Sequence, residues 1–173
     1  SDSVADWVVE TVEKLGAGWC PPGMLGIGVG GSSDRAMAMA KKALNDPLDM
    51  QALLKNGPKN KSEELRIEIY ERVNALGIGA QGLGGVTTVL DVKLKSFPTH
   101  AASLPVGLIP NCAATRHLHF TLDGTGVPKF ETPDLDAWPE ILLDEANKNA
   151  RRVDVDNLKE ETLASLKIGE TVL

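Results

Sequence analysis

Residues 20–31 of the chain read CPPGMLGIGVGG, and this stretch predicts the element around which the rest of the fold is arranged. Glycine alternates with Leu, Ile and Val over residues 25–29, a pattern that predicts a buried strand with close backbone approach. Ser32 and Ser33 follow and predict the start of a helix that runs to about residue 44. The sequence therefore predicts a strand-turn-helix unit, in which either the cysteine or the glycines could have a functional role.

Apolar periodicity along the rest of the chain extends this unit into an α/β domain. The predicted helices span residues 4–15, 62–76, 136–150 and 156–166, and the predicted strands span residues 86–95, 104–109 and 115–122. Because a chain of 173 residues suits one domain, we expect a single α/β domain over residues 1–173, with a mixed sheet flanked by helices. Both ends fall within predicted structure, so we expect a piece of a longer protein.

Composition and charge argue against two classes of partner. The formal net charge is −6, and no run of Lys and Arg forms a basic stripe, so nucleic acid is not an expected partner. No apolar run approaches the roughly 20 residues that cross a bilayer, and the acidic N-terminus is unlike a signal peptide. We therefore expect a cytoplasmic protein that does not bind a membrane.

The two cysteines, Cys20 and Cys112, are far apart in the chain and do not form a disulfide framework. Free cysteines are often simply buried, so a structural role is the first interpretation. His100 and Arg116 lie near Cys112 in a proline-punctuated segment, residues 96–116, where a thiolate would be stabilised electrostatically. A Cys-His nucleophile pair, a zinc site and an iron-sulfur site all stay open from the residue types alone.

Two segments match the pattern G-x-G-x-x-G, which is typical of dinucleotide binding. They contain Gly26, Gly28 and Gly31 in the first copy, and Gly77, Gly79 and Gly82 in the second. A dinucleotide site needs a strand directly before the first glycine. Pro21 and Pro22 precede the first copy too closely, and a predicted helix precedes the second. We therefore expect close packing and turns at these glycines, with a nucleotide-binding module as a weaker alternative.

Three segments together resemble one known family. In order they are CPPGMLGIGVGGSSD, LGIGAQGLGG and FPTHAASLPVGLIPNCAATR, and the resemblance to the α portion of class I fumarases and the related tartrate dehydratases covers about residues 4–123. These enzymes are iron-sulfur hydro-lyases. The resemblance implies reversible hydration of fumarate to malate, with dehydration of tartrate to oxaloacetate as the alternative. A cluster-free, non-catalytic domain of the same fold is a further alternative.

The resemblance also implies a site. It makes Cys20 and Cys112 two of the three cysteine ligands of a [4Fe-4S] cluster, and His100 a catalytic residue that contacts the dicarboxylate substrate. Leu104 stands where many relatives have a further cysteine that is not a ligand. Lys93 and Arg116 would also suit a dianionic substrate, although a solvated salt bridge is the preferred interpretation for both.

The third cysteine ligand of the family lies in a T-C-Q-D-T-G type segment, which this sequence lacks. We therefore expect the chain to be the C-terminal part of the α portion and to be inactive alone. Its expected partners are the remaining α and β portions of the same enzyme, which we expect to be a homodimer when complete.

Overall fold

The computed structural model describes residues 3–115, 120–127, 130, 150–167 and 170–172. Its sheet has the strand order β2-β1-β3, made of β1 (Gly23–Gly30), β2 (Val89–Phe97) and β3 (Val106–Cys112). The central strand β1 pairs in parallel with β2 and antiparallel with β3. The protein is therefore an α/β structure with a mixed sheet, as the sequence predicts.

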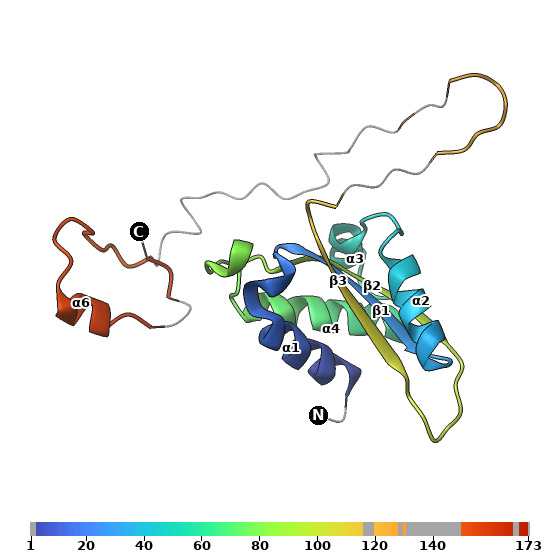
Figure 1. Ribbon diagram of the computed structural model, residues 1–173, viewed down its shortest axis with the longest axis horizontal. Coiled ribbons are helices and arrows are strands. Elements are labelled where there is room, and N and C mark those ends of the chain that lie inside the picture. The colour runs from blue at the N-terminus through green and yellow to red at the C-terminus, as the bar shows by residue number, and fades with distance from the viewer. Residues whose placement is uncertain (1–2, 116–119, 128–129, 131–149, 168–169, 173) are drawn as a thin grey trace.

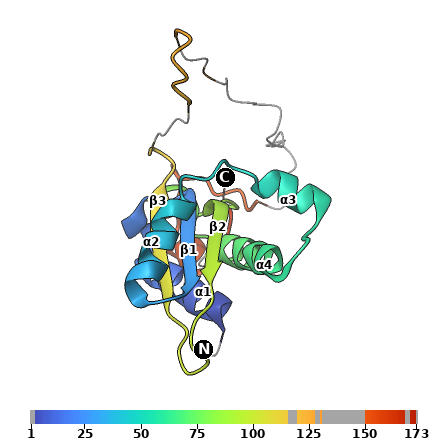
Figure 2. The ribbon, with the colours of Figure 1, turned by 90° about the vertical axis from the view of Figure 1, so that its right-hand side faces the viewer.

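Helices cover both faces of this sheet. They are α1 (Val4–Leu15), α2 (Ser33–Ala43), α3 (Met50–Asn56) and α4 (Lys61–Ala75), with short 3-10 turns at η1 (Gly16–Trp19) and η2 (Ala80–Gly82). The sheet lies between α2 on one side and α1 with α4 on the other (Figure 1 and Figure 2). The result is a three-layer arrangement around β1.

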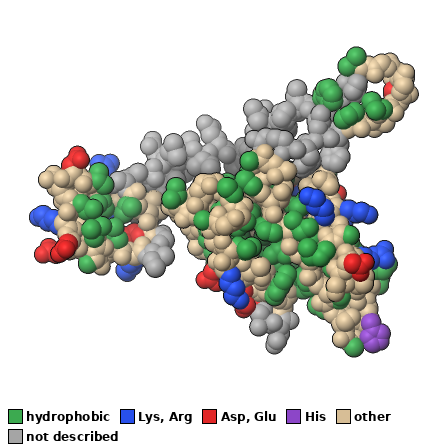
Figure 3. Space-filling model, in the orientation of Figure 1, with side chains coloured by type: hydrophobic (Ala, Val, Ile, Leu, Met, Phe, Trp, Pro, Cys, Tyr) green, Lys and Arg blue, Asp and Glu red, His purple; other side chains and the backbone are tan. Residues whose placement is uncertain are grey.

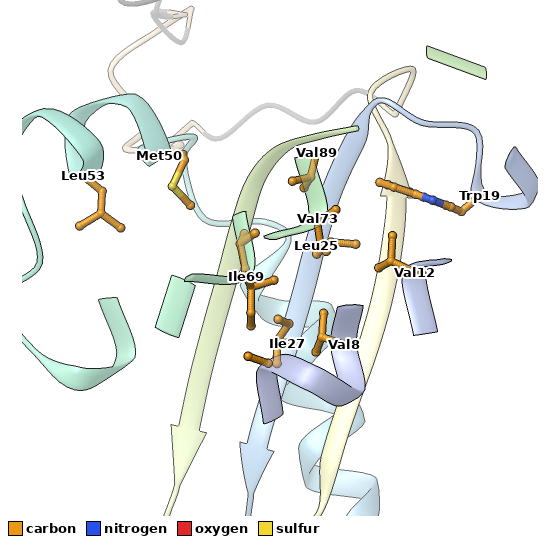
Figure 4. Packing of buried hydrophobic residues seen from close by; sticks show 12 residues of the cluster. Val8, Val12, Trp19, Leu25, Ile27, Met50, Leu53, Ile69, Val73 and Val89 are labelled. Carbon is orange, nitrogen blue, oxygen red and sulfur yellow. The ribbon is translucent and has the colours of Figure 1, made fainter. Parts of the chain in front are cut away.

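The two faces of β1 differ because its side chains alternate between them. Leu25 and Ile27 are fully buried on the face that meets α1 and α4. There they join a hydrophobic core (Figure 4) whose other members include Val8, Val12, Ile69, Val73, Val89 and Val92. Burying a side chain of this size stabilises the fold by about 1.5–3 kcal/mol, so this face supplies much of the driving force for folding.

The opposite face of β1 is glycine, which lets the backbone of α2 approach the sheet directly. A Cβ atom on Gly28 would overlap the carbonyl oxygen of Ala36 and lie 2.8 Å from its carbonyl carbon. A Cβ atom on Gly26 would lie 2.6 Å from Cγ of Leu44. The first G-x-G-x-x-G segment thus lies within a strand packed under a helix, where no phosphate could approach these two glycines.

The predicted elements agree with the structure where the hydrophobic pattern is strong. The helices predicted over 4–15 and 62–76 are α1 and α4. The strands predicted over 86–95 and 104–109 are β2 and β3, and both strands begin a few residues later than predicted. The short helix α3 was not predicted, because Pro47 precedes its segment and Gly57 and Pro58 follow it.

The predictions for the C-terminal part of the chain are partly wrong, and part of them falls outside the described residues. The strand predicted over 115–122 is wrong for residues 115 and 120–122, which are irregular, and its other residues lie outside the described part of the chain. The helix predicted over 136–150 also lies outside it, except for residue 150. The helix predicted over 156–166 is shorter and forms α6 (Glu160–Ala164). An isolated bridge pairs Arg151 with Val172.

Replacing Gly28 with alanine should destabilise the protein, because the new methyl group would push α2 away from β1. Overpacking of this kind costs about 1–3 kcal/mol, to be measured as the free energy of unfolding in urea. Gly18→Ala is the matched control, since a Cβ atom there has nothing within 4 Å. Equal stability of the two variants would contradict the proposed contact.

Candidate functional site

Cys20 and Cys112 lie at the same end of the sheet. Cys112 is the last residue of β3 and pairs with Gly23, the first residue of β1. Cys20 lies just before Gly23 in the chain, and the backbone N–H of Ala113 donates to the carbonyl oxygen of Pro22 at 3.2 Å. Both cysteines are free, with Cys20 exposed and Cys112 partly buried. The sheet register therefore places two cysteines from distant parts of the chain at the same end of the sheet.

Each of the two sulfur atoms has a polar neighbour. The Sγ of Cys20 donates to Oε1 of Gln81 at 3.3 Å. The backbone N–H of Ala114 donates to Sγ of Cys112 at 3.3 Å. Hydrogen bonds donated to a sulfur stabilise its thiolate form and tune clusters that the thiolate binds. Cys112 thus has a donor already placed for the charged form that a metal ligand requires.

The second glycine-rich segment packs against the turn that contains Cys20. The backbone N–H of Gln81, in η2, donates to the carbonyl oxygen of Pro21 at 2.7 Å. A Cβ atom on Gly82 would lie 2.5 Å from Cβ of Ala17, in the 3-10 turn before Cys20. The sequence analysis did not identify Gln81. The signal in the sequence that could have indicated Gln81 is that it is the one polar side chain in the apolar, glycine-rich segment LGIGAQGLGG.

His100 lies at the opposite end of the sheet. Its loop joins β2 to β3 beside the last residues of β1, where the N–H of Gly30 donates to the carbonyl oxygen of Pro105 at 2.8 Å. The hydroxyl of Thr99 donates to the carbonyl oxygen of Gly31 at 3.0 Å. Six residue steps of a strand, from Val106 to Cys112, span about 20 Å. Within one chain the structure does not bring His100 together with the two cysteines.

The loop around His100 borders an open hollow of about 510 Å³, lined by residues 99–104. The Nδ1 atom of His100 accepts a hydrogen bond from the backbone N–H of Ala102 at 3.1 Å. In the neutral ring the proton is then on Nε2, because only one ring nitrogen can accept. His100 can therefore donate from Nε2 to an acceptor such as a carboxylate.

Lys93 is not available to a substrate. Its side chain is only 4% exposed, and Nζ lies 2.9 Å from Oδ2 of Asp91 and 2.6 Å from Oδ1 of Asp49. It also donates to the carbonyl oxygen of Pro47. Lys93 forms salt bridges, as expected, but the expectation that it is solvated is wrong, because its side chain is buried. Arg116, together with His117 and His119, lies outside the described residues.

Arg66 of α4 completes this charged network. Its Nη2 lies 3.3 Å from Oδ1 of Asp91, contacts Asp49 closely, and its Nε donates to the carbonyl oxygen of Val92 at 2.6 Å. Burial acts to raise the pKa of Asp49, but hydrogen bonds from Arg66 and Lys93 outweigh it and hold that pKa below its ordinary value. The network ties the loop before α3 to β2 and α4.

Over residues 3–115 and the shorter described ranges after them, no three His, Cys, Asp or Glu side chains group so as to hold a metal ion. Figure 3 shows both Lys or Arg and Asp or Glu side chains scattered over this face. No helix in the described part of the chain has the length and apolar character to span a membrane.

The fold and site define an α/β unit that presents two free thiols at one end of its sheet and uses its glycines for packing. A family model described as fumarate hydratase (Fumerase) matches residues 1–121. The match covers more than half of the chain, so the chain belongs to the fumarate hydratase family.

Individual relatives agree with this assignment. The chain is 42% identical over 118 residues to a Methanocaldococcus jannaschii protein named "Putative L(+)-tartrate dehydratase subunit alpha", covering 66% of this chain and 39% of that protein. It is 31% identical over 115 residues to the L(+)-tartrate dehydratase subunit alpha of Escherichia coli K12, covering 66% of this chain and 36% of that protein. The chain thus spans less than two fifths of the length of these relatives.

Replacing Lys93 with methionine should destabilise the protein by about 3–5 kcal/mol, because it removes one partner of a buried ion pair. Lys95→Met is the matched control: Lys95 lies on the same face of β2 and pairs with Asp46 at 2.6 Å, but both side chains are more than a third exposed. That pair should contribute about 0–1 kcal/mol. Chemical unfolding of both variants measures the difference, and equal losses would contradict the buried network.

The lowered pKa of Asp49 predicts a loss of stability in acid. A carboxyl with a lowered folded-state pKa stabilises the fold above its unfolded-state pKa, about 3.9, and this contribution is lost as the pH falls through the folded-state value. Asp49→Asn should therefore flatten the decrease in unfolding free energy below about pH 4. Thermal melts over a pH series measure this. An unchanged slope would show that the Asp49 pairs do not form.

Proposed function

We propose that this chain is part of an iron-sulfur hydro-lyase that hydrates fumarate reversibly to malate. The observation that supports this proposal best is the placement of Cys20 and Cys112 at one end of the sheet, within the residues that the family model matches. In this reaction water adds across a carbon-carbon double bond, with a proton going to one carbon and the hydroxyl group to the other.

The residues at this end of the sheet fit two ligand positions of a [4Fe-4S] cluster. Thiolates are the usual ligands of such clusters, and the N–H of Ala114 is already directed at one of the two sulfurs. Cys20 and Cys112 would hold the cluster, and the third thiolate would come from a part of the enzyme outside this chain. When bound, the cluster supplies an open iron that acts as a Lewis acid on the substrate hydroxyl.

We propose that His100 contacts the dicarboxylate substrate through Nε2–H. Because its loop lies at the other end of the sheet, His100 cannot reach a substrate held at Cys20 and Cys112 of the same chain. The proposal therefore requires that His100 of one chain faces the thiols of another, which agrees with the expected homodimer. The hollow lined by residues 99–104 leaves the loop open for such a contact.

Dehydration of tartrate is the second candidate function. It is favoured by the names of the relatives, which are L(+)-tartrate dehydratase α subunits. Both reactions break or form a carbon-oxygen bond beside a carboxylate, so the same site would serve either. Comparing kcat/KM for fumarate and L-tartrate, with the complete enzyme that contains this chain, distinguishes them.

The cluster assignment is tested by anaerobic reconstitution of that complete enzyme with iron and sulfide. The unmodified enzyme should give the brown colour and broad visible absorption of a [4Fe-4S] cluster. Cys20→Ser and Cys112→Ser should each abolish the cluster and the hydratase activity, because each removes a thiolate ligand.

Leu104→Cys is the control, since residue 104 is 60% exposed and lies in the His100 loop, far from both cysteines. This variant should retain the full absorption of the cluster, because it removes no thiolate ligand. If Cys20→Ser and Cys112→Ser both kept a complete cluster and full activity, the proposed ligands would be wrong.

A further inference from the structure

We propose that Gln81 positions the Cys20 sulfur and donates a hydrogen bond to it when Cys20 binds a metal. The two side chains, from distant parts of the chain, meet at 3.3 Å between Cys20 Sγ and Gln81 Oε1. This inference rests on the proposed function, because it assigns a role in holding the cluster to a residue that is not itself a ligand.

The backbone geometry of the two residues supports a specific arrangement. Cys20 has φ +65° and Gln81 has φ +57°, and in the described part of the chain they alone are non-glycine residues in the left-handed region. This conformation costs about 1 kcal/mol or more for a residue with a Cβ atom, and it persists at functional sites that the surrounding structure holds in place. The two unfavourable conformations occur at residues whose side chains touch each other.

The loop around Gln81 is held rigidly enough to impose this conformation. The N–H of Gly84 donates to the carbonyl oxygen of Ile78 at 2.8 Å, which closes the loop on itself. The N–H of Gly79 donates to Oγ1 of Thr88 at 3.1 Å, and the N–H of Thr88 donates to Oδ1 of Asn74 in α4 at 2.7 Å. A hydrogen-bonded chain therefore fixes the Gln81 loop to α4.

A second set of contacts fixes Gln81 to the cysteine turn itself. Its backbone N–H donates to the carbonyl oxygen of Pro21 at 2.7 Å, and Nε2 lies 3.5 Å from the same oxygen. The side-chain amide is thus held between Pro21 and the Cys20 sulfur.

The amide of Gln81 suits both protonation states of Cys20. A neutral thiol donates to Oε1, as the structure has it, whereas a thiolate has no proton and can only accept. Rotation of the amide by half a turn places Nε2–H toward the sulfur, in exchange for the long 3.5 Å contact between Nε2 and the carbonyl oxygen of Pro21. A carboxylate at this position could only accept, and would repel a thiolate.

Cobalt(II) is the probe for this role, because its bonds to thiolates give a charge-transfer absorption band that does not depend on enzyme activity. Titration of the complete enzyme that contains this chain, freed of its cluster, should give a band that disappears in Cys20→Ser. Gln81→Gly and Gln81→Glu should each weaken cobalt binding by about 10–100-fold, the effect typical of losing a hydrogen bond to a metal ligand, and should shift the band.

Two controls separate this role from a structural one. Gln81→Gly should not lower Tm, because glycine adopts positive φ without strain, so its weaker binding cannot be attributed to unfolding. Leu83→Gly changes an 89% exposed residue of the same loop and should leave both cobalt affinity and the band unchanged.

The outcomes distinguish this inference from the proposed function. A cysteine-dependent band whose position and affinity are the same in both Gln81 variants would overturn the role of Gln81 and leave the thiol site intact. Absence of any band that depends on Cys20 and Cys112 would overturn the thiol site, and the role of Gln81 with it.

Discussion

The contact between the backbone of α2 and the glycine face of β1 determines the arrangement of the rest of the structure. With side chains at Gly26 and Gly28, α2 would have to move outward, since Cβ atoms there would overlap or crowd α2 and Leu44. The close approach leaves Leu25 and Ile27 facing α1 and α4, so the larger hydrophobic cluster forms on that side of the sheet, while the α2 side buries mainly small side chains such as Ala36 and Ala40. One alternating sequence therefore sets both the position of a helix and the location of the core.

The position of β1 between β2 and β3 then places the candidate site residues. Because β3 runs antiparallel to β1, its last residue, Cys112, meets the first residue of β1 and thus the turn that contains Cys20. The same antiparallel pairing places the loop with His100 at the far end. On the other edge, Lys93 and Asp91 of β2 fix the loop before α3. Nζ of Lys93 lies 2.6 Å from Oδ1 of Asp49, and the backbone N–H of Asp49 donates to Oδ2 of Asp91 at 2.9 Å. These contacts hold Cys20 and Cys112 at one end of the sheet.

Much of this arrangement could be predicted from the sequence. The 3.6-residue periodicity of α1 and α4 and the Gly-Leu-Ile-Val alternation of β1 reflect local burial, which a sequence pattern records directly. The family resemblance correctly indicated the family, and it identified Cys20, Cys112 and His100 as candidates whose roles stay predictions. The assignment of residues 1–173 to one domain also stays a prediction.

The parts that could not be predicted depend on contacts between distant segments. Gln81 and Cys20 lie close together because η2 packs on the turn that contains Cys20. No local sequence pattern encodes this contact. The separation of His100 from the thiols follows from strand direction, and the sequence does not state whether β3 runs parallel or antiparallel to β1. Burial of Lys93 likewise depends on partners from a loop and from α4.

The structure depends on a sheet register that places Cys20 and Cys112 at one end of the sheet and His100 at the other end. Electron-electron dipolar spectroscopy on spin-labelled chains measures this directly. Labels on Cys20 and Cys112 should interact strongly at short range, whereas labels on Cys112 and on His100→Cys, in a Cys20→Ser background, should lie about 20 Å or more apart. Labelled chains are diluted into an excess of unlabelled chains, so that only distances within one chain are measured. A short distance between residues 100 and 112 of one chain, or a long one between residues 20 and 112, would contradict the account.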